Sequence, residues 1–173
     1  MAENQDLRDA RYREAAAEFG AALARLARAY EADPDQRRDL LQDIHLELWR
    51  SFGGFGGQCS MRTWVYRVAH NVGISRRVRK RKLRLVTLEE VADLPATDRD
   101  DLAANESGNV MRLYALIRQL IPPDDLVMLL YLEDMSAADI GEITGLSARA
   151  VAIRVHRTKA ILARQLRPGG SND

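Results

Sequence analysis

The side chains best suited to chemistry lie at residues 61–84, where aromatic, amide, imidazole and cationic groups follow one another at helical spacing. Aromatic rings stack on unpaired bases, amides hydrogen-bond to base edges, and guanidinium and ammonium groups pair with phosphates. Seven of the last ten positions of this stretch are lysine or arginine. It therefore indicates a surface for nucleic acid. A core helix with a solvated, charged tail is the alternative that the stretch alone leaves open.

One long helix is expected to present these groups, and it begins just after a glycine-rich loop at residues 53–57. Apolar residues at helical spacing mark the face expected to be buried, namely Val65, Val68, Ala69 and Val72. The opposite face is expected to carry Thr63, Tyr66, Arg67, His70, Asn71, Ile74 and Arg77, with Trp64 at the edge between the two faces.

The formal net charge of +1 hides an uneven distribution of charge. Residues 48–88 contain ten basic side chains and no acidic one, and residues 143–170 again contain no Asp or Glu. Between these basic blocks, residues 89–108 carry seven acidic side chains against a single arginine. Two basic blocks separated by an acidic segment indicate two surfaces for an anionic partner.

Composition predicts a soluble, cytoplasmic protein without membrane insertion. Apolar residues make up 46% of the 173 positions and charged residues 29%, a globular balance. The N-terminus lacks the apolar core of a signal peptide, and no window approaches the roughly 18 apolar residues of a membrane span. Cys59, the single cysteine, cannot form an internal disulfide, which fits a reducing compartment. Cys59 is either a redox-sensitive thiol beside a basic helix or a small loop residue with no role.

The sequence predicts an all-α protein of two small helical domains joined by a flexible, acidic linker. The first domain, 6–84, has helices at 6–31, 34–52 and 61–84, with Asp33 as N-cap and Pro34 at the first helical position. The linker is expected at 85–109. The second domain, 110–168, has helices at 110–120, 124–132, 137–143 and 148–166.

The second domain ends in a pattern typical of a helix-turn-helix. Ser136 caps a short helix, Gly145 is expected to adopt a positive φ in the turn, and Ser147 caps the last helix. Its buried side is expected to carry Val151, Val155, Thr158 and Leu162. Its outward side is expected to carry Arg149, Ile153, His156, Arg157 and Ala160. Such a helix suits the major groove of DNA, whereas a generic helical hairpin is the alternative reading.

Taken together, the two halves resemble an RNA polymerase sigma factor of the extracytoplasmic-function (ECF) type, over residues 12–166. Residues 39–82 resemble sigma region 2, chiefly in the Asp-Leu-x-Gln-Asp run at 39–43 and in the segment 62–71. Residues 120–162 resemble region 4 and include Arg154, His156 and Arg157 of its Arg-x-His-Arg element. Three features depart from the family. The loop lacks its usual acidic residue and arginine, Ala150 and Ala152 replace the Thr and the Lys or Arg common in the recognition helix, and Asp124 and Asp125 replace basic or neutral residues.

The resemblance implies a role for each set of residues. Core-polymerase binding falls to Asp39, Gln42, Asp43 and Glu47. Binding of the promoter −10 element falls to Phe55, Gln58, Ser60, Arg62, Trp64, Arg67, His70, Asn71, Arg76, Arg77 and Lys80. Binding of the −35 element falls to Ser147, Arg149, Ala152, Ile153, Arg154, His156, Arg157 and Lys159. The implied partners are promoter DNA, the large-subunit clamp and flap of core polymerase, and an anti-sigma factor.

Two other functional classes stay open at this point. A stand-alone helix-turn-helix regulator would need only the second domain, although it would have no use for an aromatic, basic helix beside a glycine loop. A nucleic-acid enzyme is disfavoured because the loop lacks the Gly-Lys-Ser/Thr of a P-loop, the three histidines are scattered, and no carboxylate cluster suggests a metal. We therefore expect no catalytic residues, no cofactor and no metal.

Overall fold

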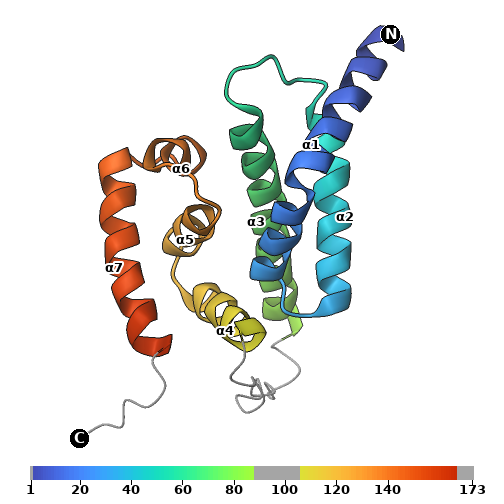
Figure 1. The fold of residues 1–173 in the computed structure, drawn as a ribbon. Helices are drawn as coiled ribbons and strands as arrows, with labels where there is room; N and C mark the ends of the chain where they lie inside the picture. Colours follow the sequence, from blue (N-terminus) through green and yellow to red (C-terminus); the bar gives the residue numbers. More distant parts are fainter. Residues whose placement is uncertain (1, 88–105, 167–173) are drawn as a thin grey trace, which may run out of the picture. The chain divides into compact units, whose positions relative to one another are not determined.

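A computed structural model describes residues 2–87 and 106–166, with side chains at 5–80 and 108–166. Within these ranges the chain forms seven helices and no strand, which confirms the predicted all-α class (Figure 1). The chain divides into two compact units, Met1–Leu94 and Pro95–Asp173.

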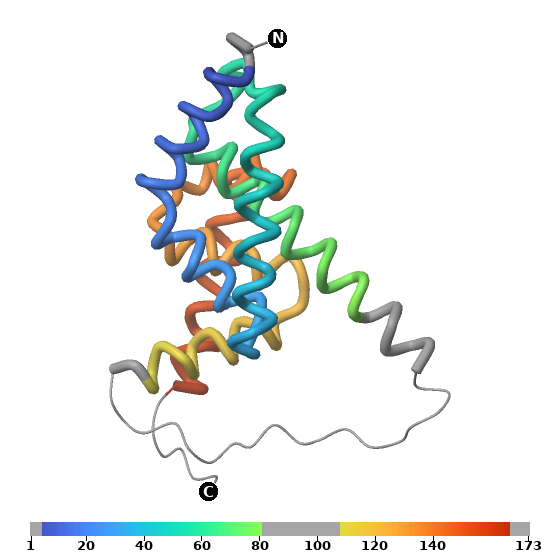
Figure 2. The backbone as a smooth tube through the Cα atoms, turned by 90° about the vertical axis from the view of Figure 1, so that its right-hand side faces the viewer, coloured from blue at the N-terminus to red at the C-terminus, as the bar shows by residue number. Residues whose placement is uncertain are grey.

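The first unit is a bundle of three helices, α1 (Ala2–Tyr30), α2 (Pro34–Ser51) and α3 (Met61–Thr87), each packed against the other two. Asp33 caps α2 as predicted, because its carboxylate accepts a hydrogen bond from the backbone N–H of Gln36 at 2.8 Å. The buried side chains of α2 are Leu40, Ile44 and Leu48, and those of α1 include Ala15, Phe19, Ala22, Leu23, Leu26 and Tyr30. Figure 2 shows the later turns of α3 diverging from α2.

The predicted division of α3 into one buried and one exposed face is wrong at five positions, two of which are Val68 and Val72, expected to be buried but only half-buried. Thr63, Tyr66 and His70 were expected to face outward but are buried. The cause is that α3 lies against both α1 and α2, so that it buries a wider face than its valines and alanine mark. The Tyr30 hydroxyl lies 2.6 Å from His70 Nδ1 and satisfies this buried ring. Gly73 permits the close approach, since a Cβ there would lie 2.9 Å from the Tyr30 ring.

The second unit places α7 (Ala148–Leu166) against α4 (Glu106–Gln119), α5 (Asp124–Leu132) and α6 (Ala137–Thr144). The predicted helix-turn-helix signals are confirmed. Ser136 caps α6 by accepting from the Asp139 N–H at 3.1 Å, and Gly145 ends that helix with φ of 76°. Ser147 caps α7 by accepting from the Ala150 N–H at 3.2 Å. These caps fix the angle at which α7 leaves the turn.

The predicted linker at 85–109 is helical at both ends, because α3 continues to Thr87 and α4 begins at Glu106. Its acidic middle, 88–105, lies outside the described residues.

His45 of α2 predicts a pH dependence for the stability of the first unit. Its Nδ1 lies 3.2 Å from the Tyr12 hydroxyl of α1, and burial lowers its pKa because desolvation penalises the charged ring. The neutral ring is favoured in the folded state, so the stabilisation is complete above the ordinary histidine pKa and is lost as the pH falls through the lowered one. We expect the free energy of unfolding to decrease on acidification from about pH 7.5 to pH 5.

Urea denaturation, followed by the fluorescence of Trp49 and Trp64, measures this dependence in the first unit. His45→Gln should flatten the decrease, whereas His156→Gln, on an exposed position of α7, should leave it unchanged. Equal pH dependence in the wild-type chain and in His45→Gln would rule out this assignment.

Candidate nucleic-acid interfaces

An aromatic pair marks the point where the glycine-rich loop enters α3. The rings of Phe55 and Trp64 have centroids 5.1 Å apart, and the Trp64 indole N–H donates to Ser51 Oγ at 3.0 Å. Phe52 is buried beneath Phe55, with ring centroids 5.9 Å apart. Phe55 and Trp64 are themselves half-buried, so an aromatic edge stays accessible. Such a pair offers a stacking surface for an unpaired base.

The loop is held in place by side chains on both sides. Arg11 of α1 donates to the Phe55 carbonyl at 2.6 Å and lies 5.5 Å from the centre of its ring. Gln58 accepts from the Gly56 N–H at 3.0 Å, and Ser60 accepts from the Thr63 N–H at 3.1 Å. The predicted contact residues Gln58 and Ser60 therefore shape the loop. Sequence reasoning missed Arg11, because it is 44 residues from Phe55 and resembles any other cation of a helical surface.

The basic edge of α3 is partly engaged within its own unit. Asn71 is exposed, and Arg62 and Arg67 are half-buried. Arg77 lies 5.8 Å above the Tyr30 ring, and Lys80 pairs with Glu31. Arg76 lies 2.8 Å from Asp43 and 3.8 Å from Asp39. Ion pairs near the surface contribute only ~0–1 kcal/mol, so phosphates can replace these carboxylates as partners of the cations.

The outer face of α2 exposes the four residues predicted to bind polymerase, namely Asp39, Gln42, Asp43 and Glu47. Beside them a groove of about 380 Å³ runs between α2 and α3. Five of its lining residues lie outside the predicted binding sets, namely Leu46, Arg50, Val72, Ser75 and Arg79. Leu46 is 46% exposed, and the only signal for it was an apolar residue out of phase with the buried stripe of α2.

The reading face of α7 is the set of predicted −35 residues on this helix. Arg149, Ala152, Ile153, His156, Arg157 and Lys159 are exposed, whereas Arg154 is half-buried. Val151, Thr158 and Leu162 are buried on the opposite side, as predicted, whereas Val155, also expected there, is only half-buried. Ile153 is 58% exposed, enough to contact a thymine methyl group. An exposed cationic face on a capped, rigid helix fits entry into a major groove.

Two arginines of the reading face share one carboxylate. Asp124, at the start of α5, accepts from Arg154 Nη1 at 2.6 Å and from Arg157 Nη2 at 2.7 Å. The sequence marked Asp124 as a departure from the family but did not reveal this contact, because thirty or more positions separate Asp124 from its partners. The arrangement gives a physical account of an acidic residue where the family commonly has basic or neutral ones.

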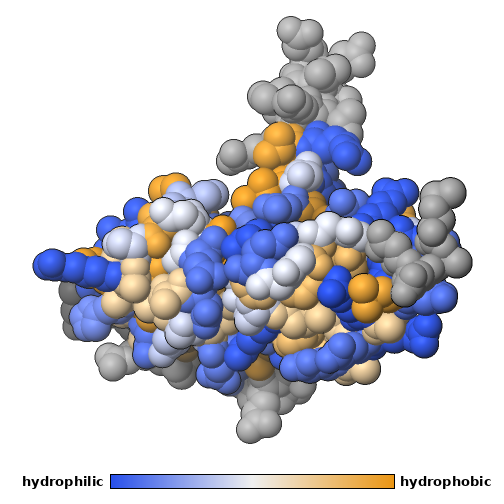
Figure 3. Space-filling view, turned by 90° about the horizontal axis from the view of Figure 1, so that it is seen from above, coloured by the Kyte–Doolittle hydropathy of each residue, from blue (hydrophilic) through white to orange (hydrophobic). Residues whose placement is uncertain are grey.

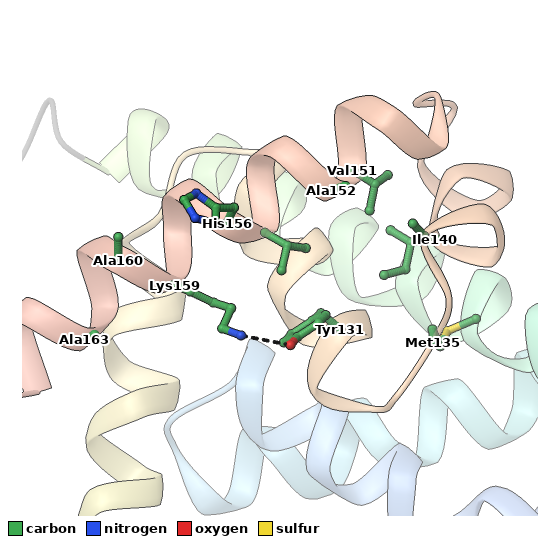
Figure 4. A pocket seen from close by; sticks show the side chains of 11 residues that line it. Tyr131, Met135, Ile140, Val151, Ala152, His156, Lys159, Ala160 and Ala163 are labelled. Carbon is green, nitrogen blue, oxygen red and sulfur yellow. Dashed lines mark hydrogen bonds between the residues drawn. The ribbon is translucent and has the colours of Figure 1, made fainter.

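A groove of about 600 Å³ opens beside the reading face, between α7 and the preceding helices (Figure 4). Apolar side chains dominate its lining, among them Met135, Ile140 and Val151. Lys159 donates to the Tyr131 hydroxyl at 3.0 Å at its edge. On the face seen in Figure 3, hydrophilic side chains are interspersed with moderately and strongly hydrophobic ones. The apolar groove suits a protein segment better than DNA.

Two further features are absent from the described part of the chain. No group of three or more His, Cys, Asp or Glu side chains there is placed to hold a metal ion. No helix within the same residues is long and apolar enough to cross a membrane.

Comparison with known proteins agrees with the two-unit arrangement. Residues 16–83 match the family model for Sigma-70 region 2, and residues 111–162 match that for Sigma-70 region 4. Over 150 residues the chain is 27% identical to the RNA polymerase sigma factor NccH of Alcaligenes xylosoxydans xylosoxydans. The aligned region covers 83% of this chain and 80% of NccH. The chain is 28% identical over 143 residues to the ECF RNA polymerase sigma factor SigW of Bacillus subtilis, covering 76% of each chain.

A solved structure shares the fold. CnrH, in complex with the cytosolic domain of CnrY, aligns with a TM-score of 0.65 at 22% identity, over 94% of this chain and 96% of that one.

Proposed function

The chain belongs to the sigma-70 family of RNA polymerase sigma factors, within the extracytoplasmic-function type, and we propose that it divides promoter recognition between its two helical units. Sigma factors direct core polymerase to promoters and are not themselves catalysts. The observation that carries the proposal is the presence of both sigma regions in order, each with a basic helical face. A stand-alone regulator would not need the first of these faces.

The first unit is proposed to bind the −10 element and to favour its melting. Phe55 and Trp64 would receive an unpaired base, and Asn71 would hydrogen-bond a base edge. Backbone phosphates would pair with Arg62, Arg67, Arg76, Arg77 and Lys80. His70 is not part of this proposal because it is buried against Tyr30.

The second unit is proposed to bind the −35 element through the reading face of α7, with Ser147 supporting the start of the helix. Guanidinium groups read guanine through O6 and N7, and Ile153 offers an apolar contact to thymine. Lys159, at the edge of the apolar groove, would pair with a phosphate.

Two protein partners are proposed as well. The polar outer face of α2 suits a basic coiled coil of the polymerase clamp, because Asp39, Asp43 and Glu47 are exposed there. The apolar groove beside α7 suits a segment of the polymerase flap or of an anti-sigma factor. The structure of CnrH with a domain of CnrY supports the latter, since a protein of this fold was solved with a protein partner.

Transcription by core bacterial polymerase tests the proposal directly. Adding the purified chain should produce promoter-dependent transcripts from genomic DNA. Asn71→Ala should reduce them about tenfold, because it removes one hydrogen-bonding side chain worth ~1 kcal/mol or slightly more without touching the core. The matched control is Asn109→Ala, an exposed asparagine of α4. Tight duplex binding by the chain alone, without affinity for core polymerase, would instead identify a stand-alone regulator.

A further inference from the structure

Asp124 differs from an incidental surface ion pair because its carboxylate binds two arginines of the reading face at once. Its two carboxylate oxygens accept from different arginines, Oδ1 from Arg154 and Oδ2 from Arg157. The Asp124 side chain is only 15% exposed, whereas those of Arg154 and Arg157 are 32% and 60% exposed. One partly buried anion therefore fixes two cations that reach toward solvent from successive turns of α7.

The position of Asp124 on α5 restricts the movement of its carboxylate. Asp124 lies in the first turn of the helix, where the helix dipole favours a negative charge. Its backbone N–H donates to the Ile121 carbonyl at 3.0 Å. The neighbouring Asp125 is buried and accepts from the Leu126 N–H at 2.8 Å, within its own helix.

The Asp124 carboxylate favours the reading of bases by Arg154 and Arg157 but weakens the attraction of these arginines to phosphates. An arginine carries five N–H donors, and the bond to Asp124 uses one from each guanidinium group. The remaining donors are held in a defined plane, and bidentate contact with a guanine edge requires such a plane. At the same time, the carboxylate offsets one of the two positive charges and weakens attraction to phosphates, which carry no sequence information.

We propose that Asp124 is a specificity-determining positioning residue for −35 recognition, an inference that rests on the proposed function of α7. It orients Arg154 and Arg157 for base contact and lowers their general affinity for the DNA backbone. Removing it should therefore make binding tighter on unrelated DNA and less selective overall.

Holoenzyme assembled from core polymerase and the full chain provides the test. Wild-type holoenzyme is first used to select binding sequences from duplexes with a randomised upstream segment. Binding to a selected and a scrambled duplex is then measured across a range of salt concentrations. Asp124→Asn should bind the scrambled duplex more tightly, with a salt slope steeper by about one, and its preference for the selected duplex should fall by about tenfold.

Two further variants separate charge from geometry. Asp124→Glu keeps the charge but displaces the carboxylate by one methylene, so binding to the scrambled duplex should stay as in the wild type while the preference falls. Asp134→Asn removes one exposed charge from the turn between α5 and α6 and should leave the preference unchanged. Circular dichroism confirms that each variant is folded.

An unchanged preference in Asp124→Asn would overturn the role of Asp124 alone, whether binding to both duplexes stays the same, weakens equally or tightens equally. Equal weakening would show a purely structural support, and equal tightening a simple charge mask. Wild-type holoenzyme that selects no upstream sequence would overturn the proposed −35 function itself, and with it any specificity role.

Discussion

Gly141→Ala is expected to destabilise the second helical unit by ~1–3 kcal/mol, although alanine is normally the better helix former. A Cβ at this position would lie 2.6 Å from the backbone carbonyl oxygen of Leu146, in the turn between α6 and α7. That turn cannot easily move away, because the Gly145 N–H donates to the Gly141 carbonyl at 2.8 Å and Gly145 has a φ of 76°. The clash therefore displaces α7, the helix that carries the reading face.

Thermal unfolding can assign this loss to one unit. Both tryptophans of the chain lie in the first unit, at positions 49 and 64. Gly141→Ala should lower the midpoint seen by circular dichroism by roughly 4–8 °C per kcal/mol, while the tryptophan fluorescence transition stays in place. Gly20→Ala is the matched control: a Cβ there meets no atom within 4 Å, so we expect a gain of ~0.5–1 kcal/mol. A Gly141→Ala chain as stable as the wild type would contradict the clash.

Features governed by local chemistry were predictable from the sequence. Asp33, Ser136 and Ser147 each cap a helix through a backbone N–H three residues further on, so a short window contains both partners. The positive φ of Gly145 was also predictable, because a glycine between two predicted helices marks the turn within a short window. Periodicity also placed Val151, Thr158 and Leu162 correctly on the buried side of α7.

Interactions between distant segments were not predictable. His70 was assigned to the exposed face of α3, but it is buried because the hydroxyl of Tyr30, forty residues earlier, lies beside its ring. The bonds from Arg11 to the loop and from Asp124 to α7 likewise join residues thirty or more positions apart. A charged side chain in a sequence gives no sign of which distant group it will meet. The sequence therefore located the candidate surfaces but not the contacts that orient their side chains.

Trp64→Ala is expected to reduce promoter opening by roughly one to two orders of magnitude while the holoenzyme still assembles. Stacking of a base on an aromatic ring contributes ~1–3 kcal/mol, and each 1.4 kcal/mol is about a tenfold change. The loss should be severe because Trp64 also supports Phe55, the other ring of the pair, at 5.1 Å. Trp64→Phe keeps an aromatic face and loses only the hydrogen bond to Ser51, so it should retain most of the opening.

Reactivity of unpaired thymines toward permanganate, measured on one promoter, reports the opening. Trp49→Ala is the matched control because Trp49 is also half-buried, donates to Asp9 at 2.7 Å and lies 3.7 Å beneath the Arg8 guanidinium. It should weaken the packing of α1 on α2 while leaving both rings of the Phe55–Trp64 pair in the chain. At a temperature where both variants are folded, opening should therefore fail in Trp64→Ala and persist in Trp49→Ala. Only the Trp64 ring is proposed to stack on an unpaired base, and the Trp49 ring is not. Equal defects in the two variants would therefore mean that Trp64 acts only through the stability of the first unit.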